Sequence, residues 1–180
     1  MHKKIPSIFT FISTFNKQEI FNLDKKVALI LRNNNKKIDK NKILEIKRFC
    51  KKNNKLIYLA NDIKQAINFG FDGVYISAFN KEFNCKKYSK KKDFIILGSA
   101  HNTMEVKIKE KQGVELIFLS PLFKTKDYKK NLGIIKFNFL SSQCKTKVIA
   151  LGGIRKRNIN KLKMVNAYGF SAITYFNEDI

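Results

Sequence analysis

Eight short apolar segments, each nearly continuous instead of alternating with polar residues, constrain the fold of this chain more than any other feature. They are rich in Ile, Val, Leu and Phe, and they lie at 7–13, 27–31, 55–60, 73–77, 94–99, 116–120, 147–151 and 170–176. Strands covered on both faces have this pattern, and parallel sheets are covered in this way. The pattern therefore predicts eight buried, parallel strands.

The segments between these strands have helical spacing. In the segment 40–53, Ile43, Ile46 and Cys50 recur on one side. Similar segments, each ending at a glycine, lie at 61–70, 102–113 and 157–169. A glycine after the last periodic residue is a common helix stop. Strands and helices therefore alternate, which predicts an α/β fold.

Eight strands with helical crossovers predict a (β/α)8 TIM barrel. Such a barrel typically has ~250 residues, so a chain of 180 residues would be a compact version. Because only residues 177–180 follow the last apolar segment, we expect the eighth helix to be truncated or absent. An open, doubly wound sheet is the alternative, and it too would bind ligands at the carboxyl ends of its strands.

The composition is that of one packed domain. The hydrophobic content is 44%, and the chain includes 16 Phe. No low-complexity block or linker rich in Pro and Gly divides the sequence, so we expect a single barrel domain over residues 1–180.

The cysteines and the apolar segments bear on the compartment. The chain has three cysteines, Cys50, Cys85 and Cys144, with no CxxC pair and no zinc-like spacing to histidine. This pattern favours a reducing, cytoplasmic location. The apolar run near the N-terminus is too short and lacks the cleavage site of a signal peptide. No segment has the 18 or more apolar residues of a membrane span, so we expect no membrane association.

The net charge of +23 raises the question of nucleic-acid binding. Only four of the 37 basic residues are Arg, and the lysines are spread along the chain. Base recognition favours Arg forks and aromatic stacking platforms, and the sequence contains no such cluster. A basic RNA-associated protein therefore remains the weaker alternative, while the same charge would attract small anionic substrates.

Polar residues follow the predicted strands at the end where a parallel barrel would gather them. They are Arg32, Asn61, Asp62, Ser99, His101, Thr125, Gly152, Gly153 and Thr174. Because the carboxyl ends of all eight strands would meet at one rim, we expect these residues to surround a common ligand site.

The two glycines after the seventh strand have two interpretations. Without a Cβ, the N–H groups of Gly152 and Gly153 could approach an anion closely, and barrels often hold phosphate near the loops after strands seven and eight. Alternatively, the glycines could simply permit a tight turn.

The order of these motifs resembles the thiamine phosphate synthase and TenI superfamily, whose members are (β/α)8 barrels. The resemblance rests on "ILR" at 30–32, "ANDIKQAINFGFDGVYI" at 60–76, "GSAHNTMEV" at 98–106, "LSPLFKT" at 119–125 and "VIALGGI" at 148–154, followed by "GFSAI" at 169–173. It implies a transferase that joins hydroxymethylpyrimidine pyrophosphate to a thiazole phosphate, with release of pyrophosphate that is held by Mg²⁺.

The resemblance also implies individual roles for these residues. Arg32 would clamp the pyrophosphate beside Asn61, and Asp62 would bind Mg²⁺. Ser99 and His101 would face the reacting groups. The residues that would contact phosphate groups are Thr125, Gly152, Gly153 and Thr174. Asp62 could instead cap the next helix, and His101 could do the same.

One departure from the family pattern leaves alternatives open. After the fourth strand the family often has a second acidic metal ligand, whereas this chain has Asn80. A neutral oxygen would hold Mg²⁺ more weakly. A relative that binds thiazole or pyrimidine phosphates without turnover is therefore one alternative. A TenI-type thiazole tautomerase is another, although Pro121 stands where that branch has histidine. The sequence also leaves a homo-oligomer open.

Overall fold

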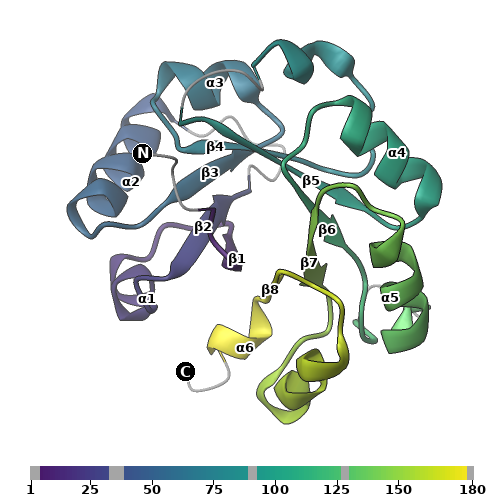
Figure 1. Cartoon of the computed structure of the whole chain (residues 1–180). Coiled ribbons are helices and arrows are strands. Elements are labelled where there is room, and N and C mark those ends of the chain that lie inside the picture. The colour runs from purple at the N-terminus through teal and green to yellow at the C-terminus, as the bar shows by residue number, and fades with distance from the viewer. Residues whose placement is uncertain (1–4, 33–38, 89–92, 127–129, 178–180) are drawn as a thin grey trace.

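The chain folds into a closed barrel of eight parallel strands, numbered in the order in which they occur around the barrel (Figure 1). The computed structural model describes residues 5–32, 39–88, 93–126 and 130–177. The strands are β1 (Ile8–Ile12), β2 (Val27–Leu31), β3 (Ile57–Ala60), β4 (Gly73–Ile76), β5 (Ile95–Ala100), β6 (Leu116–Leu119), β7 (Lys147–Leu151) and β8 (Gly169–Ser171). The predicted (β/α)8 architecture is confirmed.

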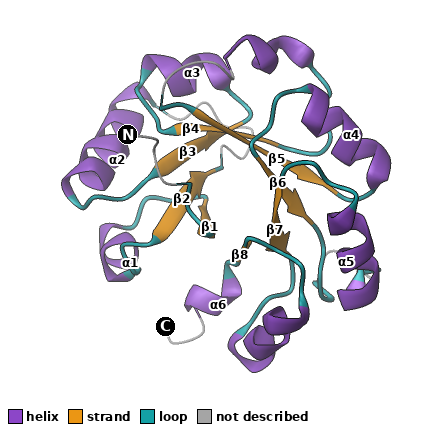
Figure 2. Ribbon diagram, in the orientation of Figure 1, coloured by secondary structure: helices purple, strands orange, loops and turns teal. Residues whose placement is uncertain are grey.

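Helices surround the strands on the outside (Figure 2). The α-helices are α1 (Lys17–Asn22), α2 (Lys40–Lys52), α3 (Ile63–Asn68), α4 (Thr103–Lys111), α5 (Gly133–Ser142) and α6 (Thr174–Asn177). Two crossovers contain 3₁₀ helices instead, namely η1 (Phe83–Tyr88) after β4 and η2 (Lys156–Met164) after β7. No helix within the described part of the chain is long and apolar enough to cross a membrane.

The continuous apolar strands have two buried faces because each separates two parts of the core. In β2, Ala28 and Ile30 belong to the cluster inside the barrel. Leu29 and Leu31 belong to the cluster between the sheet and the helices. Side chains alternate across a strand, so a strand buried on both sides needs apolar residues at every position.

Aromatic rings fill much of the barrel interior. The Phe118 ring lies 5.0 Å from Phe9 and 5.3 Å from Tyr75, measured between centroids, and Phe11 lies 5.2 Å from Tyr75. These pairs have the edge-to-face geometry that aromatic rings favour. The barrel is therefore packed through its centre, and a ligand at the carboxyl end would rest on an aromatic floor.

The end of the chain differs from its prediction. The segment 170–176 was expected to be a strand, but only Gly169–Ser171 pairs in the sheet, and Thr174 begins α6. The Tyr175 ring packs edge-on against Phe170 at 5.7 Å, and the Phe176 ring stacks parallel to Phe170 at 6.4 Å. This packing overrides the strand propensity of Ile, Thr, Tyr and Phe. Of the two expectations for the eighth helix, truncated or absent, the described residues show a helix of four residues, Thr174–Asn177.

The segment after β7 is a 3₁₀ helix and not the α-helix that its spacing predicts. Asn158 explains the difference. Its side chain donates to the Gly153 carbonyl oxygen at 2.8 Å and accepts from the Arg155 N–H at 2.8 Å. Such side-chain bonds to the backbone compete with a regular helix.

Candidate active site at the carboxyl end of the barrel

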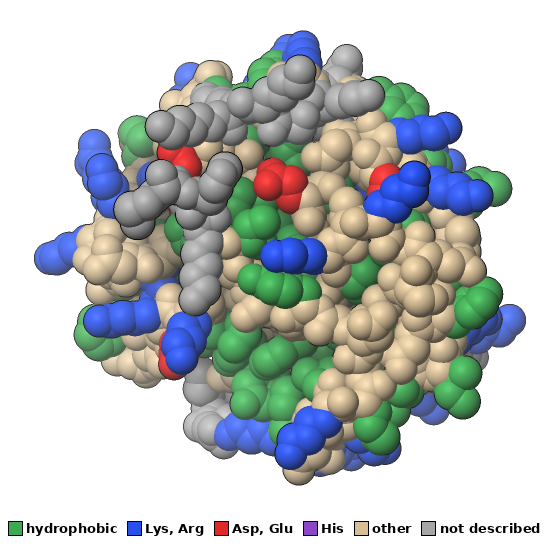
Figure 3. Space-filling view, viewed as in Figure 1, with side chains coloured by type: hydrophobic (Ala, Val, Ile, Leu, Met, Phe, Trp, Pro, Cys, Tyr) green, Lys and Arg blue, Asp and Glu red, His purple; other side chains and the backbone are tan. Residues whose placement is uncertain are grey.

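The predicted site residues end or follow strands at the carboxyl end of the barrel, with Thr174 lying beyond β8 at the start of α6. Two of them contact a residue of the neighbouring strand or of the loop that follows it. Arg32 lies over Phe11, and Asn61 accepts from Ser77. On the face drawn in Figure 3, the described Lys and Arg side chains are scattered, mostly toward the edge, without a continuous basic stripe.

Arg32 leaves the end of β2 and crosses toward β1. Its N–H donates to the Ile12 carbonyl oxygen at 2.8 Å, which continues the strand pairing by one residue. Its guanidinium carbon lies 3.8 Å from the centroid of the Phe11 ring. A guanidinium over a ring face is held by a cation–π interaction. Arg32 is exposed, so it presents a positioned cation at the mouth.

Asn61 joins the ends of β3 and β4. Its backbone has the left-handed φ of 61°, which Asn tolerates better than most residues. Its Oδ1 accepts from the Ser77 N–H at 2.9 Å and from the Ser77 hydroxyl at 2.7 Å. The side-chain oxygen of Asn61 is therefore committed to the neighbouring loop, and only its amide group remains to contact a ligand.

Asp62 caps a helix, which is one of the two roles that the sequence left open for it. Its Oδ1 accepts from the Gln65 N–H at 2.8 Å, at the N-terminus of α3. Such a cap satisfies a backbone donor that the helix cannot pair internally. A carboxylate has about four acceptor positions, so capping leaves room for a further contact.

The oxygens near Asp62 decide whether Mg²⁺ fits this rim. Asn80 Oδ1 accepts from the Glu82 N–H at 3.0 Å, and the Asn61 oxygen is also engaged. The described residues include no cluster of three or more His, Cys, Asp or Glu that could hold a metal. Mg²⁺ often binds through one or two carboxylates together with substrate phosphates. Of the residues predicted for this site, Asp62 is the one carboxylate, and its binding of Mg²⁺ stays a prediction.

Ser99 and His101 lie at the end of β5. Ser99 is 5% exposed, and strand alternation puts its side chain on the inner side with Leu97. His101 Nδ1 lies 2.8 Å from the Ser120 carbonyl oxygen. A carbonyl oxygen only accepts, so Nδ1 is the donor in this contact. The cap of α4 is Asn102, so His101 is not the N-cap.

A reciprocal set of hydrogen bonds holds His101 at this point. Glu105 accepts from the His101 N–H at 2.7 Å and from the Asn102 side chain at 3.0 Å. The Asn102 side-chain oxygen accepts from the Glu105 N–H at 2.9 Å. These contacts cap α4 and fix the turn between β5 and α4.

The space beside Gly152 and Gly153 is filled by the loop after β6. Both glycines have left-handed φ values, 98° and 68°. A Cβ on Gly152 would lie 2.8 Å from Pro121 Cα, and one on Gly153 would lie 2.6 Å from the Lys124 carbonyl oxygen. The close approach of this loop is therefore sufficient to require glycine at both positions.

The turn after β7 still offers donors. Within the described residues, the N–H groups of Gly153 and Ile154 make no hydrogen bond. Successive N–H groups near left-handed residues form a concave nest that suits an anion. Thr125, which is half-buried, belongs to the loop that packs on this turn. Thr174 is exposed, beyond the end of β8.

Three residues that the sequence analysis did not assign a role support the site, namely Phe11, Ser77 and Ser120. In the sequence, Phe11 cannot be distinguished from other apolar core residues. Its position under Arg32 follows only from the pairing of β1 with β2. Ser77 and Ser120 each immediately follow a strand, and that position is the only sequence signal that distinguishes them.

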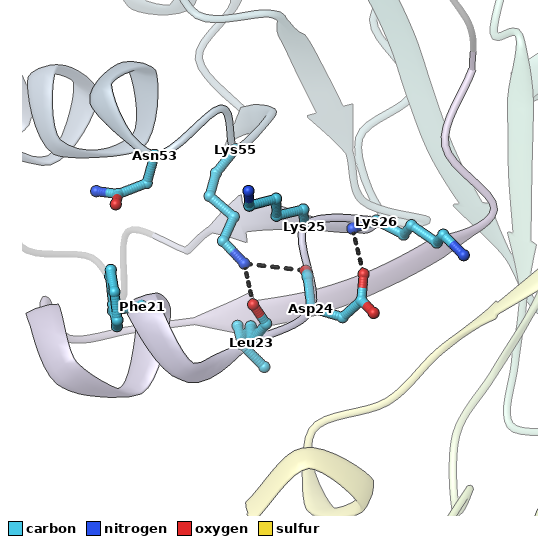
Figure 4. Close-up of a pocket in the computed structure, with 7 residues that line it drawn as sticks. All are labelled: Phe21, Leu23, Asp24, Lys25, Lys26, Asn53 and Lys55. Carbon is cyan, nitrogen blue, oxygen red and sulfur yellow. Dashed lines mark hydrogen bonds between the residues drawn. The ribbon is translucent and has the colours of Figure 1, made fainter.

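A cavity of about 450 Å³ lies at the opposite, amino-terminal end of the barrel (Figure 4). It adjoins Lys55, whose Nζ donates to the Leu23 carbonyl oxygen and, at 2.9 Å, to that of Asp24. Lys55 thus satisfies carbonyl groups at the end of α1, and burial lowers its pKa. This lysine serves the structure of the amino-terminal end.

The fold is a closed parallel (β/α)8 barrel with polar residues at its carboxyl rim. Enzymes with this fold bind their ligands at that rim. The family model described as thiamine monophosphate synthase matches residues 19–176. The chain belongs to this family.

Thiamine-phosphate synthases are among the similar proteins. That of Methanosarcina barkeri is 31% identical over 134 residues, covering 72% of this chain and 60% of the relative. That of Prochlorococcus marinus subsp. pastoris is 31% identical over 122 residues, covering 67% and 35%. The chain thus spans from about a third to 60% of these relatives. A solved thiamine phosphate pyrophosphorylase from Pyrococcus furiosus shares the fold, with a TM-score of 0.73, 14% identity and coverage of 95% of this chain and 90% of that chain.

Proposed function

We propose that this chain joins hydroxymethylpyrimidine pyrophosphate to a thiazole phosphate. The thiazole nitrogen forms a bond to the pyrimidine methylene carbon, the bond from that carbon to the pyrophosphate oxygen breaks, and the oxygen keeps the electron pair. The products are thiamine monophosphate and pyrophosphate. The observation that carries the proposal is the match to the family over residues 19–176, on a barrel whose rim bears the expected residues.

The leaving pyrophosphate needs positive charge more than it needs a base. We assign this role to Arg32, supported by its exposed guanidinium at 3.8 Å over Phe11. The amide group of Asn61 would donate to the same phosphates. Asp62 would hold Mg²⁺ against the substrate, and the ion would neutralise the departing charge.

The thiazole phosphate would bind at the other side of the rim. We assign it to the N–H groups of Gly153 and Ile154, with Gly152 shaping the turn. Thr174 would contribute its hydroxyl from the region after β8. Thr125 would approach the pyrophosphate from the loop after β6, which packs on this turn.

Ser99 and His101 would face the reacting pyrimidine. Ser99 would orient the ring from the inner face of β5. For His101, the contact of Nδ1 with the Ser120 carbonyl oxygen fixes the ring, and we propose that the ring orients the substrate. Neither residue has to remove a proton for the bond to form.

The proposal is tested by incubating the purified chain with both substrates and Mg²⁺ and measuring thiamine monophosphate and pyrophosphate. We expect both products in equal amounts, with formation abolished in the presence of EDTA and greatly reduced in Arg32→Ala. Finding neither product above background would reject the activity.

A second candidate is a relative that binds the same phosphates without turnover. It is favoured because Asn80 is neutral and the Asn61 oxygen already accepts two hydrogen bonds, which leaves Asp62 as the carboxylate among the residues predicted for this part of the rim. Calorimetry with each substrate separates the two functions. Binding that is indifferent to Mg²⁺, together with absent product, would support the binding protein.

We also propose a reducing, cytoplasmic location, supported by the free thiols of Cys50 and Cys144.

A further inference from the structure

Helix α4 carries a lysine whose charged end is buried. Lys109 is 0% exposed. Its Nζ donates to the carbonyl oxygens of Ser77 at 2.8 Å and Asn80 at 2.7 Å, and to Gln112 Oε1 at 3.0 Å. An ammonium has three donors, and a buried charge is unfavourable unless hydrogen bonds compensate it. A Cβ at Gly98 would lie 3.0 Å from Lys109 Cδ, so glycine leaves room for the side chain.

Gln112 adds two bonds to the same loop. It is also 0% exposed, and its Nε2 donates to the carbonyl oxygens of Asn80 at 3.1 Å and Glu82 at 2.9 Å. This loop connects β4 to η1, a crossover in which a 3₁₀ helix replaces the usual α-helix. Lys109 of α4 and the C-cap residue Gln112 thus satisfy backbone carbonyl groups of this loop.

The loop held by Lys109 is also the loop that holds Asn61. The Ser77 carbonyl accepts from Lys109, while its N–H and hydroxyl donate to Asn61 Oδ1. Asn61 immediately precedes Asp62, the carboxylate assigned above to Mg²⁺. Hydrogen bonds therefore run without interruption from the buried ammonium to the rim of the candidate active site.

We propose that Lys109 is a positioning residue, which fixes the loop after β4 and thereby the Asn61 and Asp62 part of the rim before any ligand binds. The effect on kinetics that we expect from it rests on the proposed function. Without the ammonium, ligand binding would have to order the loop, which weakens binding. The KM for the pyrimidine pyrophosphate and the Mg²⁺ concentration for half-maximal rate therefore rise about tenfold, and kcat changes little.

The first test does not depend on activity. Amide hydrogen exchange of the whole chain is compared for wild type, Lys109→Met and, as the matched control, Lys107→Met, which removes an exposed lysine from the same helix. We expect exchange of the Ser77 and Asn80 amides to accelerate at least tenfold in Lys109→Met and to stay unchanged in Lys107→Met. Equal exchange in wild type and Lys109→Met would overturn the proposal.

Kinetics of the same variants then test the functional consequence. A rise in KM for the pyrimidine pyrophosphate, with an unchanged KM for the thiazole phosphate, supports positioning of one part of the rim. An equal rise for both substrates, or a fall in kcat alone, would overturn it. If wild type makes no product, the proposed activity fails, but the exchange experiment still decides whether Lys109 holds the loop.

Asn61→Ala offers a second route that leaves the buried charge intact, should Lys109→Met fail to fold. The Asn80 N–H donates to the Ser77 carbonyl oxygen at 3.1 Å. If Lys109 anchors the loop, Ser77 loses amide protection in Asn61→Ala while Asn80 keeps it. Loss of protection at both amides would mean that Asn61, and not Lys109, holds the loop.

Discussion

The guanidinium carbon of Arg32 lies 3.8 Å from the centroid of the Phe11 ring, across the paired ends of β2 and β1. The ring belongs to the aromatic packing inside the barrel, and it has edge-to-face contacts with Tyr75 and Phe118. A core side chain thus sets the position of the most important cation that we assign to the site. The packing of the barrel and the binding of an anion are coupled through this ring.

Replacing Phe11 with Leu should weaken binding of the pyrophosphate group. A cation–π interaction contributes about 0.5–2 kcal/mol, so we expect KM for the pyrimidine pyrophosphate to rise about twofold to thirtyfold. Phe9→Leu is the matched control, since Phe9 packs against Tyr58 and Phe118 in the same interior. Steady-state kinetics of both variants check the prediction, and an equal rise in KM would contradict it.

Gly153→Ala should destabilise the chain because its added methyl group meets the backbone of the loop after β6. We expect a loss of about 2 kcal/mol or more in the free energy of unfolding, measured by urea titration. Gly70→Ala isolates the cost of backbone conformation. Its φ is 67°, against 68° for Gly153, but nothing lies within 4 Å of the added Cβ. Similar losses in both variants would show that the loop contact is unimportant.

Glu105→Ala should loosen the turn that carries His101. The variant loses the acceptor of the His101 N–H and of the Asn102 side-chain N–H. We expect a loss of about 1 kcal/mol in stability and faster exchange of the His101 amide. Thermal denaturation and hydrogen exchange measure these effects. An unchanged His101 amide would contradict the assigned role of Glu105.

The buried thiol of Cys50 makes stability depend on alkaline pH. Burial raises its pKa from 9.0 to about 11, against the opposing influence of Lys47. The folded state therefore keeps this proton longer than the unfolded state does, and the stabilising contribution is complete below pH 9 and lost as the pH rises to about 11.

Comparison with Cys50→Ala isolates this contribution from other groups that titrate nearby. The stability of wild type relative to the variant should fall by about 1–3 kcal/mol between pH 9 and pH 11. Urea titrations at several pH values measure the difference. A difference that stays constant over this range would contradict the raised pKa.

Much of the barrel could be predicted because its strands are buried on both sides, which leaves a clear apolar pattern. The strands Val27–Leu31 and Lys147–Leu151 have the predicted bounds. Helices α1 and α5 were not predicted. Helix α5 (Gly133–Ser142) is mostly apolar, with Ile135 88% and Phe139 62% exposed, so it lacks the polar face that marks a surface helix.

The site was less accessible to sequence reasoning because its contacts join residues that are distant in the chain. The pattern placed Asn61 and Gly153 at strand ends, but it did not indicate that Ser77 occupies the Asn61 oxygen or that the loop after β6 covers Gly153. Lys109 looked like one surface lysine among many. Only the packing of α4 against the loop after β4 reveals that it is buried.

The close seating of residues 121–124 on the Gly152–Gly153 turn has a consequence for how this barrel varies among relatives. The Leu122 N–H donates to the Leu151 carbonyl oxygen at 2.8 Å, and the Phe123 N–H donates to that of Gly152 at 3.0 Å. The two loops are therefore joined by backbone hydrogen bonds. Neither loop is free to lengthen, shift or hinge at its base without its neighbour. In this family we therefore expect the two segments to be inherited and altered as a unit.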